Sequence, residues 1–127
     1  MRALLVDDSL LLRNMVERAI RASDLPIDTF VHATNGKDAL QVLRIERRHG
    51  NKFDLIVTDT NMPLMSGLEF LEQVQAENLC PGVQIVMVTT EDSQEHLARA
   101  AAAGSKGNIC KPFTAEQINT VIRPLLE

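Results

Sequence analysis

The sequence predicts an α/β protein built on one parallel β-sheet with helices on both faces. Five short apolar runs alternate with five stretches of helical periodicity, in units of about 25 residues. Parallel strands need helical crossovers of this kind, and strands covered on both faces read as continuous apolar runs. No linker or low-complexity tract interrupts the pattern, so we expect a single domain over residues 1–127.

The first strand is predicted over Arg2–Asp7, because four consecutive residues within it are apolar. Ser9 can cap the helix that follows, in which Arg13 is expected on the solvent side. The expected core side of this helix consists of Leu12, Met15, Val16, Ala19 and Ile20. Residues 27–33 mix polar and apolar side chains, which indicates an edge strand with one solvent-exposed face.

Asn35 and Gly36 predict a turn into a second helix, whose basic end at residues 44–49 we interpret as a solvated helix terminus. A docking patch is the less favoured interpretation of that end. The central strand is the apolar run Leu55–Val57, which leads to Asp59. Taken alone, Asp59 could be a metal ligand, a nucleophile, or a helix cap or turn residue.

The third and fourth units follow the same pattern. Ser66 and Gly67 open a third helix. Val83–Val88 is a buried strand that ends on Thr89. The stretch Asp92–Glu95 fits a capping box, with Asp in place of Ser or Thr.

The C-terminal quarter contains the fifth unit. The Ala-rich fourth helix should stop at Gly104, and a short fifth strand is predicted over Gly107–Lys111. Thr114–Gln117 is a second capping box at the start of the last helix. Pro124 lies inside that helix, where its ring clashes with the carbonyl one turn earlier, so we expect the final turn to bend or fray.

Composition narrows the class of protein. The net charge of −4 argues against a general nucleic-acid binder, and the absence of Trp and Tyr leaves few surfaces for base stacking. Cys80 and Cys110 lie far apart with no metal-ligand spacing, so we expect two buried, reduced thiols. There is neither an apolar run of about 18 residues nor a signal peptide, which predicts a soluble, cytoplasmic protein.

Polar side chains follow four of the five predicted strands. In chain order they are Asp7, Asp8, Asp59, Thr89 and Lys111. Because the carboxyl ends of parallel strands share one edge of the sheet, these side chains should converge on one crevice. An ordinary ion pair between Lys111 and a carboxylate would explain the charge balance, but not why a hydroxyl and further acids share the same edge.

This set of side chains suits phosphoryl transfer with a divalent metal. Three neighbouring carboxylates repel one another, so at least one should have a raised pKa unless a cation neutralises them. Oxygen ligands without His or Cys favour Mg²⁺. Phosphoryl transfer needs a nucleophile in line, a metal and a Lys on the phosphoryl oxygens, and a hydroxyl that fixes one of them.

From end to end, the chain resembles the response-regulator receiver domains of two-component signalling, of the CheY-like type. The resemblance is carried by Val6–Ser9, Asp59–Glu69, Val88–Thr89 and Lys111–Phe113. It implies the flavodoxin-like or CheY-like doubly wound fold, (βα)5 with strand order 2-1-3-4-5. It also implies that Asp59 is phosphorylated by the phosphohistidine of a sensor histidine kinase or a phosphotransfer protein.

Further roles are implied by the same resemblance. Mg²⁺ would be held by Asp7, Asp8, Asp59 and the backbone carbonyl of Asn61, while Thr89 and Lys111 would contact the phosphoryl oxygens. The bond from Lys111 to Pro112 would be cis. The flanking residues Asn61, Thr90 and Glu91 would influence water attack, and their types imply fairly fast self-dephosphorylation, as in chemotaxis-type receivers.

One position departs from the family pattern. Asn108 stands where the family usually has its switch aromatic, three residues before Lys111. The resemblance implies that phosphorylation changes the face formed by the fourth helix, fifth strand and fifth helix for a downstream protein. With Asn108, the aromatic rotamer change cannot operate, although we expect the same output face.

The expected role is therefore a stand-alone signalling switch rather than an enzyme acting on external substrates. A small Asp-nucleophile phosphatase usually has a second Asp two residues after its nucleophile, and Asn61 occupies that position here. The alternative is a degenerate receiver that acts as a phosphorylation-independent interaction module, which only Asn108 favours. We expect protein partners, neither nucleic acid nor membrane, and a monomer or a weak phosphorylation-dependent dimer.

Overall fold

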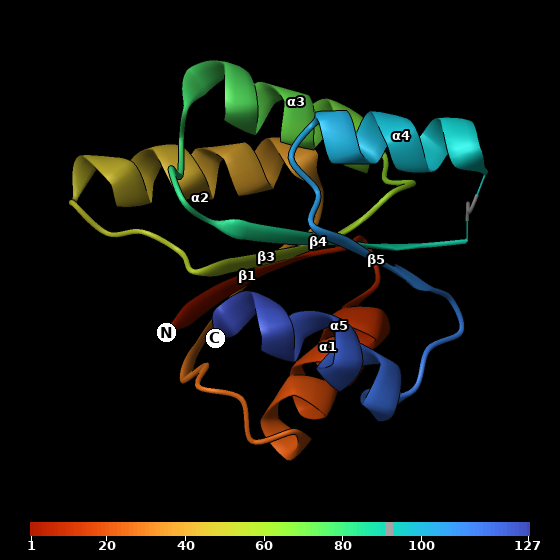
Figure 1. The fold of residues 1–127 in the computed structure, drawn as a ribbon. Coiled ribbons are helices and arrows are strands. Elements are labelled where there is room, and N and C mark those ends of the chain that lie inside the picture. Colours follow the sequence, from red (N-terminus) through yellow and green to blue (C-terminus); the bar gives the residue numbers. More distant parts are fainter. Residues whose placement is uncertain (91–92) are drawn as a thin grey trace.

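The computed structural model describes residues 1–90 and 93–127, in which strands and helices alternate strictly (Figure 1). The strands are β1 (Arg2–Val6), β2 (Thr29–Ala33), β3 (Leu55–Asp59), β4 (Gln84–Thr89) and β5 (Gly107–Cys110). The helices are α1 (Leu10–Ala22), α2 (Gly36–Arg48), α3 (Gly67–Glu77), α4 (Gln94–Ala102) and α5 (Ala115–Leu126).

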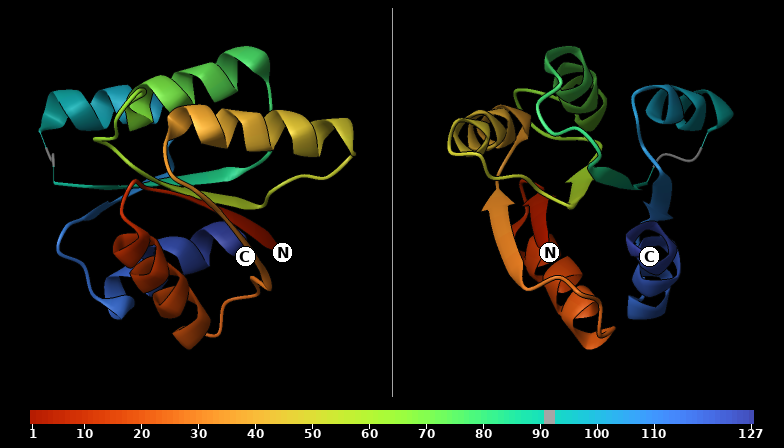
Figure 2. Two further views of the ribbon diagram at one scale, coloured as in Figure 1. Left: turned by 180° about the vertical axis from the view of Figure 1, so that it is seen from behind. Right: turned by 60° about the vertical axis from the view of Figure 1, so that its left-hand side comes forward.

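The five strands form one parallel sheet in the order β2-β1-β3-β4-β5. The predicted fold class and strand order are thus confirmed, with β2 at an edge as its mixed composition indicated. Helices α1 and α5 cover one face of the sheet, and α2, α3 and α4 cover the other (Figure 2). All five residues of β3 are buried, because this strand is central and covered on both faces.

The sheet divides the hydrophobic core into two clusters. Neighbouring strand residues point to opposite faces, so Leu4 and Ile56 belong to the cluster under α2, α3 and α4. Leu5 and Val57 belong to the cluster under α1 and α5. β1, β3 and β4 each contribute buried residues to both clusters, which fixes their register and the position of their carboxyl ends.

Capping explains where most of the helices begin. Ser9, Asn35, Ser66 and Thr114 each accept a backbone N–H of the first helical turn, and the box predicted at Thr114 is present. The cap of α4 is Ser93, whose hydroxyl accepts the N–H of His96. The predicted cap, Asp92, was one residue too early and lies outside the described residues. 

The expected burial of three side chains, Arg13, Met15 and Cys110, was wrong. Arg13 is only 8% exposed and Met15 is 40% exposed, because Arg13 shares the inner face of α1 with Val16, one turn further along. Cys80 is buried as expected, but Cys110 is exposed at the end of the edge strand β5. The last helix continues through Pro124 to Leu126, so its final turn does not fray, and the alternative expectation of a bend at Pro124 stays a prediction.

Two of the basic residues at the C-terminal end of α2 form hydrogen bonds within the fold. The guanidinium of Arg44 donates to both carboxylate oxygens of Glu77 on α3, at 3.1 and 2.6 Å. Arg47 donates to the backbone carbonyl of Glu77 at 3.0 Å. These bonds hold α2 against α3 and lower the pKa of the Glu77 carboxyl to about 2, chiefly through Arg44. Within the described chain, no helix combines the length and apolar character needed to cross a bilayer.

Candidate functional site

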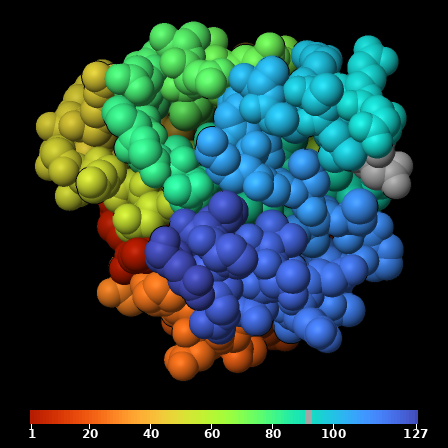
Figure 3. Space-filling model, viewed as in Figure 1, coloured from red at the N-terminus to blue at the C-terminus, as the bar shows by residue number. Residues whose placement is uncertain are grey.

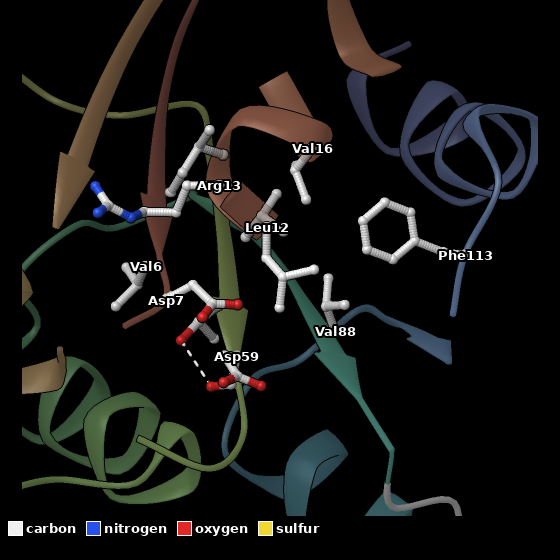
Figure 4. A pocket seen from close by; sticks show the side chains of 11 residues that line it. Val6, Asp7, Leu12, Arg13, Val16, Asp59, Val88 and Phe113 are labelled. Carbon is white, nitrogen blue, oxygen red and sulfur yellow. Dashed lines mark hydrogen bonds between the residues drawn. The ribbon is translucent and has the colours of Figure 1, made fainter. Parts of the chain in front are cut away.

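The acidic residues that follow β1 and β3 converge at the carboxyl edge of the sheet. Asp7 and Asp8 come directly after β1, and Asp59 is the last residue of β3. Each offers a carboxylate oxygen within 4.8 Å of the other two. Asp7 and Asp59 are buried, while Asp8 is exposed. Figure 4 shows Asp7 and Asp59 close together at the ends of neighbouring strands.

Lys111 supplies the cation of this cluster. Its Nζ donates to Asp59 Oδ1 at 2.9 Å and lies 3.7 Å from Asp7 Oδ2. The backbone N–H of Thr60 also donates to Asp59 Oδ1, at 2.8 Å. The Lys111 N–H donates to the carbonyl of Thr89 at 2.8 Å, and the peptide bond to Pro112 is cis, as the resemblance implies.

Lys111 alone does not neutralise the negative charge of the three carboxylates. The pKa of Asp7 is raised to about 6, mainly because the carboxyl is buried and also because the charge of Asp59 is close. The N–H of Ser9, which donates to Asp7 Oδ1 at 2.9 Å, and the ammonium of Lys111 act in the opposite direction. The sequence-based expectation that one carboxylate has a raised pKa is confirmed.

The loop between β3 and α3 is held tightly against Asp59. The N–H of Gly67 donates to the carbonyl of Thr60 at 2.7 Å. A Cβ atom at position 67 would lie 2.2 Å from the carbonyl oxygen of Asp59, so only glycine fits there. Leu64 has a φ of 72° and is 72% exposed, an unusual combination for a bulky apolar residue.

The remaining predicted residues take different positions. Thr89 is buried at the end of β4, on the same sheet edge as the acids. Asn61 and Thr90 are exposed, and Glu91 lies outside the described residues. Asn108 lies within β5, two residues before the end of the strand, and lines a groove beside α5 rather than the acidic cluster.

Arg13 is the residue at this site that sequence reasoning missed. It lines a small cavity of about 10 Å³ with Asp7, Asp59 and surrounding apolar side chains. Its Nε is buried and has no hydrogen-bond partner among residues 1–90 and 93–127. Figure 4 shows its guanidinium pointing away from Asp59. Its spacing of three and seven residues from Val16 and Ile20 is the sequence signal that could have placed it inside.

The cluster fits a hard divalent cation. Three carboxylates and one ammonium leave a net negative charge, and a buried carboxyl with a raised pKa shows that this charge is poorly neutralised by the protein alone. The available donors are oxygens, which suit Mg²⁺ better than a transition metal. The acidic pocket therefore has the character of the Mg²⁺ pocket of receiver domains, with Asp7, Asp8 and Asp59 as the residues that would hold the ion.

Comparisons with known proteins agree with this fold and geometry. The response regulator receiver domain family matches residues 3–123. Chemotaxis protein CheY of Pseudomonas aeruginosa is 35% identical over all of this chain and 97% of its own length. Chemotaxis protein CheY-3 of Vibrio cholerae is 34% identical over all of this chain and 92% of its own length. The solved structure of Vibrio cholerae chemotaxis protein CheY4 covers 98% of both chains with a TM-score of 0.81 and 31% identity.

These matches span nearly the whole chain, and three of the residues that carry the resemblance, Asp7, Asp8 and Asp59, lie together at one edge of the sheet. The chain belongs to the response regulator receiver domain family and is a CheY-like member of it.

Proposed function

We propose that this protein is a phospho-acceptor switch, and that Asp59 receives the phosphoryl group from the phosphohistidine of a histidine kinase or phosphotransfer protein. The observation that carries the proposal is the position of the Asp59 carboxylate. It lies within 4.8 Å of two further carboxylates and accepts a 2.9 Å hydrogen bond from Lys111. The chemotaxis proteins that match over the whole chain support a signalling role.

The proposed transfer is a displacement at phosphorus. A carboxylate oxygen of Asp59 forms the new P–O bond while the P–N bond to the donor imidazole breaks, and the leaving nitrogen keeps the electron pair. Lys111 compensates negative charge on the phosphoryl oxygens. Bound Mg²⁺ supplies further neutralisation of that charge, and Asp7, Asp8 and the backbone carbonyl of Asn61 are its proposed ligands beside Asp59.

After transfer, the phosphoryl group adds about two negative charges to the crevice. We propose that the hydroxyl of Thr89 contacts this group and that the change biases the surface of α4, β5 and α5 toward a downstream protein. Asn108 on β5 replaces the aromatic residue that is usual in the family. We propose that water attack on the acyl phosphate then resets the switch, with Asn61 and Thr90 influencing that attack; Glu91, the third residue predicted to do so, lies outside the described residues.

Exposed apolar side chains support a protein as the donor. Leu10 and Leu11 follow Asp8 closely in the chain and are 60% and 70% exposed. Leu64, in the loop after Asp59, is also mostly exposed. A donor whose histidine reaches Asp59 must also cover part of the surface formed by Leu10, Leu11 and Leu64. Burial of these large apolar side chains favours such a complex.

The test is the intact mass of the protein after treatment with acetyl phosphate. We expect the gain of one phosphoryl group in the presence of Mg²⁺, and no gain with EDTA or in Asp59→Asn. Asp24→Asn, which changes an exposed carboxyl far along the chain from the cluster, is the matched control and should gain the group like the wild type. A phosphoryl gain in Asp59→Asn equal to that of the wild type would contradict the proposal.

Phosphorylation-independent binding is the alternative. Under that alternative, a downstream protein would bind the wild type and Asp59→Asn with equal affinity, before and after acetyl phosphate. The intact acid cluster and its contact with Lys111 favour the phosphorylated switch.

A further inference from the structure

A groove of about 370 Å³ lies between β5 and α5, away from the acidic cluster. One wall is formed by residues 108–110 of β5, and the other by the side of α5 that includes Glu116, Thr120 and Val121. In the space-filling view, the two blue segments β5 and α5 lie next to each other on the visible face (Figure 3). The groove is thus open to a partner molecule on the proposed output face.

Among the described residues that line this groove, one buried polar atom has no hydrogen-bond partner. Asn108 Oδ1 is buried and has no hydrogen-bond partner in the described part of the chain. A buried polar atom left unpaired is unfavourable by about 1–3 kcal/mol, so its occurrence calls for an explanation. Asn108 itself lines the groove. A donor from a bound partner would satisfy its Oδ1.

The charge of the lining residues further restricts which ligands the groove can bind. The carboxylate of Glu116 is exposed at the rim, and the lining residues of the described chain include neither Lys nor Arg. Thr114 and Gln117 also line the groove, but they already bond each other's backbone N–H in the capping box of α5. The groups left for a ligand are therefore one carboxylate and neutral polar groups.

We propose that this groove binds a basic side chain of the downstream protein, arginine in preference to lysine. The proposal rests on the proposed function, because it names the chemistry of the partner at the same output face. The aliphatic stem of the side chain would pack on Val121 and Ile109, while its cationic head meets Glu116 and the carboxamide of Asn108. A guanidinium presents five donors in a plane and can reach both acceptors at once, which an ammonium does less well.

The experiment is a titration of the ¹⁵N-labelled full chain, followed by NMR, with N-acetyl-arginine methylamide as the probe. We expect saturable shifts at the amide signals of residues 108–110 and 120–121, and weaker shifts with the lysine analogue. Glu116→Gln should weaken binding about fivefold, as removal of one partly exposed charge pair does. Glu95→Gln removes an exposed carboxylate of α4 outside the groove and is the matched control, with unchanged binding.

Other occupants give different results. Equal shifts with N-acetyl-leucine methylamide would show an apolar docking site, and shifts that depend on protein concentration without ligand would show self-association; either result overturns the proposal. Binding that is the same in Glu116→Gln and the wild type also overturns it. The gain of a phosphoryl group at Asp59 is measured separately by mass, so a failure of the groove proposal leaves the phospho-acceptor proposal standing.

Discussion

Replacing Asp7 with Asn should stabilise the metal-free protein and abolish its response to Mg²⁺. The pKa of Asp7 is raised from 3.8 to about 6, mainly by burial. As the pH rises, this carboxyl ionises in the unfolded chain before it ionises in the folded protein. The free energy of unfolding therefore falls between about pH 4 and pH 6 and stays low above that range. A shift of about two pKa units corresponds to about 3 kcal/mol.

Asn removes this penalty while keeping the local structure. Its side-chain oxygen can still accept the N–H of Ser9, which donates to Asp7 Oδ1 at 2.9 Å in the wild type. Without metal at neutral pH, we expect Asp7→Asn to be more stable by up to about 3 kcal/mol, equivalent to a rise in Tm of about 10 °C for a domain of this size. At about pH 4, where the carboxyl is protonated in the folded protein and only about half ionised in the unfolded chain, the difference in stability should shrink to less than about 1 kcal/mol.

The assay is thermal unfolding by circular dichroism, in EDTA and in Mg²⁺, at both pH values. At a Mg²⁺ concentration about ten times its Kd, the wild type should gain about 1.4 kcal/mol, and Asp7→Asn should gain nothing. Asp24→Asn controls for the loss of an exposed carboxyl and should behave like the wild type. The reasoning is refuted if Asp7→Asn is no more stable than the wild type in EDTA at neutral pH.

Three further predictions concern the loop, the pH dependence and the donor. Gly67→Ala should destabilise the protein by about 3 kcal/mol in urea unfolding, because the new Cβ meets a backbone carbonyl. Gly36→Ala should cost less, since its obstacle is a movable Met side chain; equal losses would contradict this reasoning. Glu17 has a lowered pKa, chiefly through its 2.8 Å contact with His32. The stability lost in Glu17→Gln at neutral pH should therefore begin to shrink as the pH falls below 4.5 and vanish once the folded-state carboxyl is protonated, which urea unfolding across pH can check. Leu11→Glu should slow phosphoryl transfer from an autophosphorylated histidine kinase about tenfold and leave the rate with acetyl phosphate unchanged; equal slowing with both donors would exclude a docking role.

Much of the fold could be predicted from local patterns in the sequence. Apolar runs and helical periodicity are local properties, and the caps at Ser9 and Thr114 are short-range bonds that the sequence shows directly. The convergence of Asp7 and Asp59 also follows from a simple rule, because the carboxyl ends of parallel strands share an edge.

The sequence-based predictions were wrong or incomplete where tertiary packing determines which side chains are buried. Arg13 was assigned to solvent because of its charge, although its position on α1 turns it toward the sheet. The exposure of Leu11 and Leu64 leaves no periodic signal, since it depends on which surfaces the folded chain leaves uncovered. The contact that requires glycine at position 67 joins a helix start to a strand end, and its distance cannot be read from spacing alone.

The division of the core by the sheet has a consequence for how this protein tolerates change. Ile56 and Val57 are consecutive in the chain, yet each packs in a different layer. A cavity made in one layer is separated from the other by a hydrogen-bonded backbone, so truncations on opposite sides should combine without epistasis, while pairs within one layer should not. The two halves of the interior can therefore change in sequence independently, while the acidic cluster at the edge of the sheet is supported by both.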